Sequence, residues 1–405
     1  MYWVNLLHIY QPPGQKKKII DQVVLESYNR ILSVLESKKE VKISLNVCAS
    51  LTQQLFEFGH RDVVERIKKL AENGQIELVA SAAYHPILSL LPKTEIMRQI
   101  RLNEEINQKY FGKVWKPKGF FLPELAYDKK VGEIIKKSGY QWMVLDEIAY
   151  QGSFGKISFN KIYKLKFLFC FFKNKDFKII FRNRGLSLLF FGNWLDSVDK
   201  FFSAVKKDRR SDKFLVTAFD GENLGHHRKH LADLWSEILN NPEIKAITYS
   251  EYLNLLKDAP SEKVSPLASS WATEMKDLEK NVPYPLWRHP ENQLHRLQWQ
   301  LTDFLIKTIK HCRSDSNYNE ARNLLDQALA SDQYWWASIK PWWNPGIIER
   351  GAQNFVRVGR LLEKSADFGT KNRIEKTAQD IFNELERRKK SENYRTIEKI
   401  GDWKG

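Results

Sequence analysis

KGFFLPELAYDKKVGEIIKKSGYQWMVL, residues 118–145, contains a strand, a helix and a second strand in immediate succession. Residues 118–122 form a short apolar run that ends at Pro123-Glu124, and residues 142–145 form another. Between them, Lys129–Ser138 places its apolar side chains at helical spacing. A strand, a helix and a strand in this order predict a parallel βαβ unit, because parallel strands need a long crossover connection.

The same alternation extends over residues 1–258 and predicts six or seven such units, enough to close an α/β barrel. Residues 162–191 interrupt the rhythm, and we interpret them as an inserted β-hairpin that turns at Lys173–Asp176. The further strands are expected at Tyr2–His8, Lys42–Cys48, Ile76–Ala80, Phe214–Phe219 and Ile247–Tyr249, and the further helices at Asp21–Glu36, Arg61–Asn73, Thr94–Tyr110 (opened by a Thr cap) and His230–Leu239.

Residues 259–405 form a second region, in which strand patterns are lost from about position 290 onward. Helical periodicity predicts an all-helical C-terminal domain. We expect this domain to contribute to the active-site cleft. Its helices are expected at Leu294–Lys310, Asn319–Lys340, Ile347–Ser365 and Lys371–Lys399.

Composition excludes several classes of protein. A hydrophobic content of 42% in 405 residues is that of a globular chain. The net charge of +16 comes with 49 interspersed acidic residues and no nucleic-acid-binding module, so we expect a solvated basic surface and no nucleic-acid partner.

Cysteine usage and hydropathy bear on the compartment. Cys48, Cys170 and Cys312 are too few and too far apart for a disulfide framework or a metal-type cluster. No apolar run approaches the ~18–20 residues of a membrane span. The N-terminal MYWVNLLHIYQPP has no basic leader and is interpreted as a strand. A cytoplasmic protein with no membrane partner is therefore expected.

Polar residues directly after the apolar strands are the candidate functional groups, since catalytic groups of a parallel barrel lie beyond the carboxyl ends of its strands. They are His8, Gln11, His85, Glu124, Asp220, Glu222 and His226. Glu124 and Asp220 follow different strands, and two carboxylates on one rim are the minimum equipment for cleaving a glycosidic bond. Either acid alone would be better explained as a capping residue, but their occurrence together with His8, His85 and His226 on neighbouring loops favours a site. Arg182 and Arg184 could reach the same rim or form structural ion pairs.

These segments resemble the five sequence regions of glycoside hydrolase family 57. The family's His-x-His-Gln-Pro is similar to residues 8–12, HIYQP, and its second region resembles residues 74–88, which contain Glu77 and His85. GFFLPELAYD and FDGENLGHH resemble the third and fourth regions, and SSWATE (269–274) resembles the looser fifth together with residues 281–295.

The resemblance implies a (β/α)7 barrel with a helical domain and a retaining mechanism on α-glucosidic linkages. It implies that Glu124 is the nucleophile and Asp220 the general acid/base, with no cofactor and no obligatory metal. The partner would be an α-glucan or malto-oligosaccharide, and the enzyme an α-amylase or a 4-α-glucanotransferase. The expected substrate-binding residues are His8, Gln11, Glu77, His85, Phe121, Glu222, His226 and Trp271.

Two departures from the family pattern bear on specificity. Tyr10 stands where the family usually has a second histidine, and Phe121 stands where many members carry tryptophan, which gives a smaller sugar platform. Neither change removes a catalytic group.

Two other functions stay open. A divalent-metal polysaccharide deacetylase would use Asp220, His226 and His230 as ligands, because His226 and His230 are spaced by four residues. A non-catalytic α-glucan-binding protein would keep sugar binding without turnover.

Overall fold

The structure is a computed structural model that describes residues 1–166, 176–208, 213–339, 341–362 and 365–390. It divides into two compact units. The first comprises Met1–Ala83 and Leu88–Trp271, and the second comprises Tyr84–Ile87 and the described residues from Ala272 onward. No helix in the described ranges is long and apolar enough to cross a membrane.

The first unit is built around strand β1 (Tyr2–Ile9), which is buried along nearly its whole length. β1 pairs in parallel with β2 (Ile43–Val47), β8 (Phe214–Asp220) and β9 (Lys245–Ile247), and β2 pairs with β3 (Ile76–Val79). Continuous burial is expected of parallel strands covered on both faces.

A second sheet of this unit has the strand order β10-β6-β7-β5-β4. Its strands are β4 (Gly119–Phe121), β5 (Trp142–Asp146), β6 (Ile162–Leu165), β7 (Lys178–Arg182) and β10 (Ser261–Val264). The two sheets are linked by the bridge Ala80↔Phe120 on one side and by Asn183 N donating to Val216 O on the other. The two sheets together resemble a barrel, but continuous strand pairing does not close it.

The expected hairpin is present as the antiparallel pairing of β6 with β7, whereas its turn at 173–176 lies largely outside the described residues. The second strand is not part of an insertion, because β7 also pairs in parallel with β5. Residues 259–271 were expected in the helical domain, but β10 pairs with β6 and this stretch belongs to the first unit.

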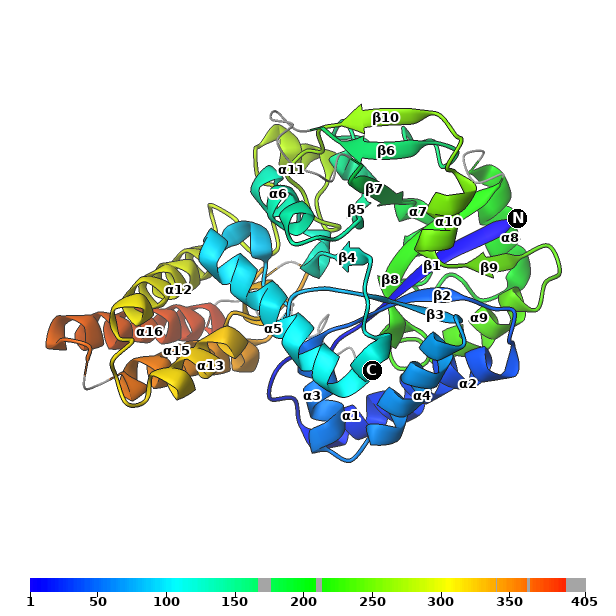
Figure 1. The fold of residues 1–405 in the computed structure, drawn as a ribbon. Coiled ribbons are helices and arrows are strands. Elements are labelled where there is room, and N and C mark those ends of the chain that lie inside the picture. Colours follow the sequence, from blue (N-terminus) through cyan, green and yellow to red (C-terminus); the bar gives the residue numbers. More distant parts are fainter. Residues whose placement is uncertain (167–175, 209–212, 340, 363–364, 391–405) are drawn as a thin grey trace. The chain divides into compact units, whose positions relative to one another are not determined.

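Helices cover the strands of the first unit (Figure 1). The helix expected at 21–36 is α1 (Lys17–Val23), the π-helix η1 (Val24–Tyr28) and α2 (Asn29–Ser37). The other α-helices are α3 (Ala49–Glu57), α4 (Arg61–Glu72), α5 (Lys93–Phe111), α6 (Lys129–Lys137), α7 (Arg184–Leu188), α8 (Val198–Lys207), α9 (Leu231–Leu239) and α10 (Tyr249–Leu255). Short 3₁₀ turns are η2 (Leu88–Leu90), η3 (Gly112–Val114), η4 (Pro123–Leu125), η5 (Glu147–Ala149) and η7 (Gly221–Asn223).

Two expected boundaries of the first unit were wrong. Thr94 does not cap α5, which begins at Lys93 directly after Pro92 and has no side-chain cap. Tyr249 is not in a strand, because Thr248 and Glu251 form a capping box that starts α10.

The second unit is helical, as expected. Its helices are α11 (Met275–Glu279), α12 (Gln293–His311), α13 (Tyr318–Ala328), α14 (Asp332–Trp335), α15 (Pro345–Leu361) and α16 (Phe368–Lys389). Its core includes Leu305, Phe355 and Ile381, all fully buried. The single helix expected at 319–340 is two helices, α13 and α14, and residues 340 and 391–399 lie outside the described ranges.

Candidate active site

His8 and Asp220 lie side by side at the carboxyl ends of the central strands, because they are register partners in the β1–β8 ladder. The His8 ring is buried, and its Nδ1 lies 2.7 Å from Asn46 Oδ1 on β2. Burial lowers the pKa of His8 to about 4, and the contact with Asn46 opposes this shift. His8 is therefore neutral at pH 7.

Glu124 lies in the turn η4, three residues after β4, and has a left-handed backbone, with φ 59° and ψ 17°. Leu125 is also left-handed, with φ 47°. Such conformations cost about 1–3 kcal/mol in residues other than glycine and collect at functional sites. The strain is stabilised by the surrounding chain, since Trp271 N donates to Glu124 O at 3.0 Å.

Glu124 and Asp220 are partly exposed residues, while the chain around each of them is buried. Phe214–Phe219 are buried and Asp220 is not fully so, and Glu124 is partly exposed between buried Pro123 and buried Leu125. A side chain that contacts a substrate needs such partial exposure among its buried neighbours.

A series of contacts within the first unit connects the surroundings of the two acids. Phe121 stacks on His8 with ring centroids 4.4 Å apart, and Trp271 meets Phe121 edge-on at 6.1 Å. Arg182 Cζ lies 5.2 Å from the Trp271 ring centroid. The positive charge of Arg182 acts on Asp220. β1, β4, β7 and β8 thus bring their carboxyl ends to one place.

The electrostatics of Asp220 suit an acid that holds a proton near neutrality. Burial raises its pKa to about 6, and the Arg182 charge opposes the shift. Arg182 is held by Asp146 Oδ2 at 2.8 Å and by Ala218 O at 2.8 Å, so its charge is fixed in position. Arg184 also reaches Asp146, at 3.5 Å, and forms a cation–π contact with Phe154.

Glu222 is buried one residue beyond Gly221, and its Oε1 accepts from Tyr28 Oη at 2.5 Å and from Tyr10 N at 2.9 Å. Burial and the neighbouring charge of Asp220 raise the pKa of Glu222 to about 8. Gln11 is joined to the same group through a hydrogen bond with Tyr28.

The structure does not bring every expected residue to this place. In the sheet register, His8 pairs with Asn46, and Asn46 pairs with Val79. Glu77 precedes Val79 by two residues and therefore lies nearer the amino end of the strands than His8. There it accepts from Ser44 Oγ at 2.8 Å and from Ser250 N at 3.1 Å, and so binds the start of α10. His226 Nδ1 lies 2.6 Å from Glu26 Oε2.

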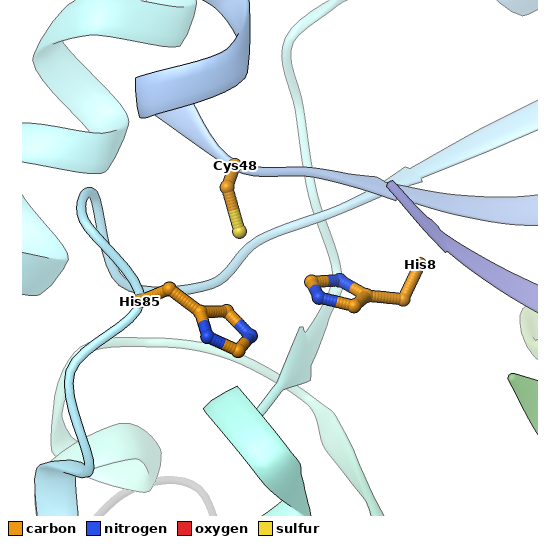
Figure 2. A group of neighbouring side chains, drawn as sticks. All are labelled: His8, Cys48 and His85. Carbon is orange, nitrogen blue, oxygen red and sulfur yellow. The ribbon is translucent and has the colours of Figure 1, made fainter. Parts of the chain in front are cut away.

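Figure 2 shows His8, Cys48 and His85. Within the first unit, a ring nitrogen of His8 and the Cys48 sulfur lie within 4.8 Å of each other at the ends of β1 and β2. His85 belongs to the second unit, where its Nδ1 lies 3.1 Å from Ser331 Oγ and its φ is 56°. Cys48 and Cys312 are free and buried, and Cys170 lies outside the described residues.

The metal triad considered for a deacetylase does not assemble in the described part of the chain. Asp220, His226 and His230 are not among the side-chain groups that lie close enough to share an ion. His226 is engaged by Glu26, and His230 Nε2 lies 2.9 Å from Leu195 O. The deacetylase alternative is therefore not favoured.

Tyr28, Asn46 and Asp146 contact candidate residues and were not predicted. Asn46 carried a signal, because it is a polar residue at an alternating position of an otherwise apolar strand. Tyr28 carried none, since a tyrosine in an amphipathic helix is ordinarily a packing residue.

Comparison with known proteins identifies the chain's relatives. Residues 8–266 match the profile of Glycosyl hydrolase family 57. The chain is 22% identical over 343 residues to an alpha-amylase of Pyrococcus abyssi, covering 80% of this chain and 50% of that protein. It is 20% identical over 390 residues to a 4-alpha-glucanotransferase of Thermococcus litoralis, covering 88% and 57%. The chain thus spans about half the length of these curated relatives.

Solved structures show the same fold. A family 57 branching enzyme from Thermococcus kodakaraensis superimposes with a TM-score of 0.69 at 15% identity, covering 98% of this chain and 95% of that one. The 4-alpha-glucanotransferase from Thermococcus litoralis does so with a TM-score of 0.66 at 19% identity, covering 89% and 60%. The family match extends over more than half of the sequence and includes His8, Glu124 and Asp220. This chain belongs to glycosyl hydrolase family 57.

Proposed function

We propose that the protein is a retaining enzyme on α-glucans, with Glu124 as nucleophile and Asp220 as general acid/base. The observation that carries the proposal is the pair of partly exposed acidic residues, Glu124 in the turn after β4 and Asp220 at the end of β8, each flanked by buried residues. Amylase and glucanotransferase activities among the relatives support α-glucan as the substrate.

In the first step, ionised Glu124 forms a bond to the anomeric carbon while Asp220 gives its proton to the departing glycosidic oxygen. The electron pair of the broken C–O bond stays on that oxygen. In the second step, Asp220 takes a proton from water or from a sugar hydroxyl, which displaces Glu124. We expect the partly exposed Trp271 ring to stack on C–H groups of the sugar. Phe121 and His8 are almost fully buried and would support this surface.

The test is incubation with maltoheptaose, followed by analysis of product length and of the first anomer formed. Shorter products alone mean hydrolysis, and longer ones mean transfer. Proton NMR should show the α-anomer first, and initial β-anomer would contradict retention. Glu124→Gln and Asp220→Asn should each abolish turnover, while Glu65→Gln, which changes an exposed acid paired with Lys68, should not. Unchanged α-glucans with the wild-type protein would overturn the proposal.

A further inference from the structure

The Glu222 side chain joins the turn after Asp220 to two segments that are remote in the sequence, the π-helix η1 and the loop after β1. Its Oε1 accepts from Tyr28 Oη of η1 at 2.5 Å and from Tyr10 N of the loop at 2.9 Å. The residue is only 4% exposed. Its hydrogen-bonding capacity is therefore directed at the protein, as is usual for a buried polar group.

Tyr28 extends this connection to Gln11, which forms a hydrogen bond with the same tyrosine. Both Tyr28 and Gln11 are buried. Tyr10 and Gln11 directly follow β1, the strand that carries His8. Glu222 is thus connected to the loop beside His8 twice, by its own bond to Tyr10 and through Tyr28.

The turn that contains Glu222 begins immediately after Asp220, at Gly221. Ser27 Oγ of η1 donates to Gly221 O at 2.9 Å. A Cβ on Gly221 would lie 2.6 Å from Ile9 Cγ2, so the turn also packs closely on the end of β1. Because Asp220 precedes this turn directly, the contacts that hold the turn also fix the end of β8.

The π-helix presents neighbouring residues to neighbouring parts of the turn. The consecutive residues Ser27 and Tyr28 contact the consecutive residues Gly221 and Glu222. π-helical turns are rare and occur often at functional sites. The contacts of η1 place this one beside the carboxyl end of β8.

We propose that Glu222 is a positioning residue which, through its acceptor oxygen, holds η1 and the loop after β1 against the turn and so keeps Asp220 where it protonates the leaving oxygen. This inference rests on the role proposed above for Asp220. It assigns Glu222 a role other than the contact with substrate that the sequence suggests. Proton transfer requires the acid within hydrogen-bond reach of the reacting oxygen, and a misplacement of about 1 Å can cost ~100-fold in rate.

The proposed role requires an acceptor atom at position 222 and no negative charge. Burial, followed by the charge of Asp220, raises the pKa of Glu222 to about 8, so this carboxyl group is largely neutral at pH 7. Glutamine has nearly the same shape and keeps an acceptor oxygen for Tyr28 and Tyr10, whereas leucine fills the space without an acceptor. Glu222→Gln and Glu222→Leu therefore separate a positioning acceptor from a carboxyl group that takes part in the chemistry.

The first experiment needs no turnover. Hydrogen exchange of the Tyr10 amide, which donates to Glu222 Oε1, is followed by NMR. The amide should be protected in wild type and in Glu222→Gln. In Glu222→Leu it should exchange at least about tenfold faster, because it loses its acceptor. Equal protection in Glu222→Leu and wild type would overturn the proposal, whether or not the enzyme acts on glucans.

The second experiment measures delivery of the proton. Glu222→Leu should lower kcat/KM for maltoheptaose about 100-fold, the effect of a misplaced acid. Glu222→Gln should lose no more than about threefold, because its amide oxygen can still accept both hydrogen bonds. With α-maltosyl fluoride, whose leaving group needs little protonation, the loss in Glu222→Leu should be much smaller. Tyr28→Phe removes one of the two bonds and should reduce kcat/KM for maltoheptaose about tenfold.

Tyr252→Phe is the matched control, since it removes a buried hydroxyl that joins α10 to Phe159 O at 2.8 Å. It should leave the Tyr10 exchange rate and the ratio of rates on the two substrates unchanged.

Two kinetic outcomes contradict the proposal. Equal losses on both substrates in Glu222→Leu would mean a merely structural role, and an inactive Glu222→Gln would mean that the carboxyl group itself is needed. If Glu222→Leu does not fold, Tyr28→Phe is judged by the same ratio of rates. Lack of turnover in wild type together with the expected exchange pattern would remove only the proposed function.

Discussion

Asp220 illustrates how burial of a carboxyl group affects stability. Its pKa is raised from 3.8 to about 6 in the folded protein, so the folded state binds more protons than the unfolded state between these values. Stability therefore falls as pH rises through this window. The ionised carboxylate destabilises the fold by at most about 3 kcal/mol, since one pKa unit corresponds to ~1.4 kcal/mol.

We expect Asp220→Asn to be more stable than wild type at pH 8, with the difference vanishing below about pH 4, where Asp220 is protonated in both states. Urea unfolding at both pH values measures this. Asp196→Asn is the control, because Asp196 is exposed and its hydrogen bond with Lys200 lowers its pKa, so it should gain no stability at pH 8. A constant difference for Asp220→Asn at all pH values would contradict the expectation.

Gly225 is the residue that lets the π-helix approach the turn after Asp220. Its φ is +109°, and a Cβ at this position would lie 1.9 Å from Glu26 O. Gly225→Ala should lower the free energy of unfolding by about 2–4 kcal/mol, from backbone strain and overpacking together.

The matched control for Gly225 is Gly74→Ala. Gly74 also has a positive φ, +75°, but nothing lies within 4 Å of the added Cβ. It should cost only ~1–2 kcal/mol, the strain alone. If both variants lose the same free energy of unfolding in urea, the expectation is wrong and η1 moves to accommodate the new methyl group.

At the scale of elements, the ion pair of Arg182 with Asp146 joins β7 to β5 and is almost fully buried. Arg182→Met leaves Asp146 without its main partner, and removal of one member of a buried pair costs ~3–5 kcal/mol. Thermal unfolding measures the loss. Lys200→Met removes an exposed partner of Asp196 and should cost less than ~1 kcal/mol. Equal losses of stability in Arg182→Met and Lys200→Met would contradict this expectation.

Elements were predictable where local periodicity was strong. The βαβ unit at 118–145 is present as β4, α6 and β5. The helix at 21–36 was predicted without its π-helix, because the extra residue leaves the apolar pattern of the flanking turns intact and is stabilised by contacts with residues 221–226. β10 was missed, because its four residues SEKV have no apolar alternation and their pairing with β6 is remote in sequence.

At the scale of the whole molecule, each compact unit has a hydrophobic core of its own. We expect scanning calorimetry to show more than one transition, since large chains with separate cores depart from two-state unfolding. Leu6→Ala in β1 and Phe355→Ala in α15 remove fully buried side chains, and each should destabilise its own unit by ~3–5 kcal/mol. A single transition shifted equally by both variants would contradict this.

The fold class, the helical character of the second unit and the family were predictable from the sequence, because hydrophobic periodicity and short motifs are local properties. The positions of Glu124 and Asp220 after strands were predictable in the same way. The surroundings of the two acids became visible only in the folded chain. The left-handed backbone of Glu124, the stacking of Phe121 on His8 and the contact of Tyr28 with Glu222 join residues far apart in the chain. Such contacts depend on strand register and on the π-helix, which no local pattern specifies.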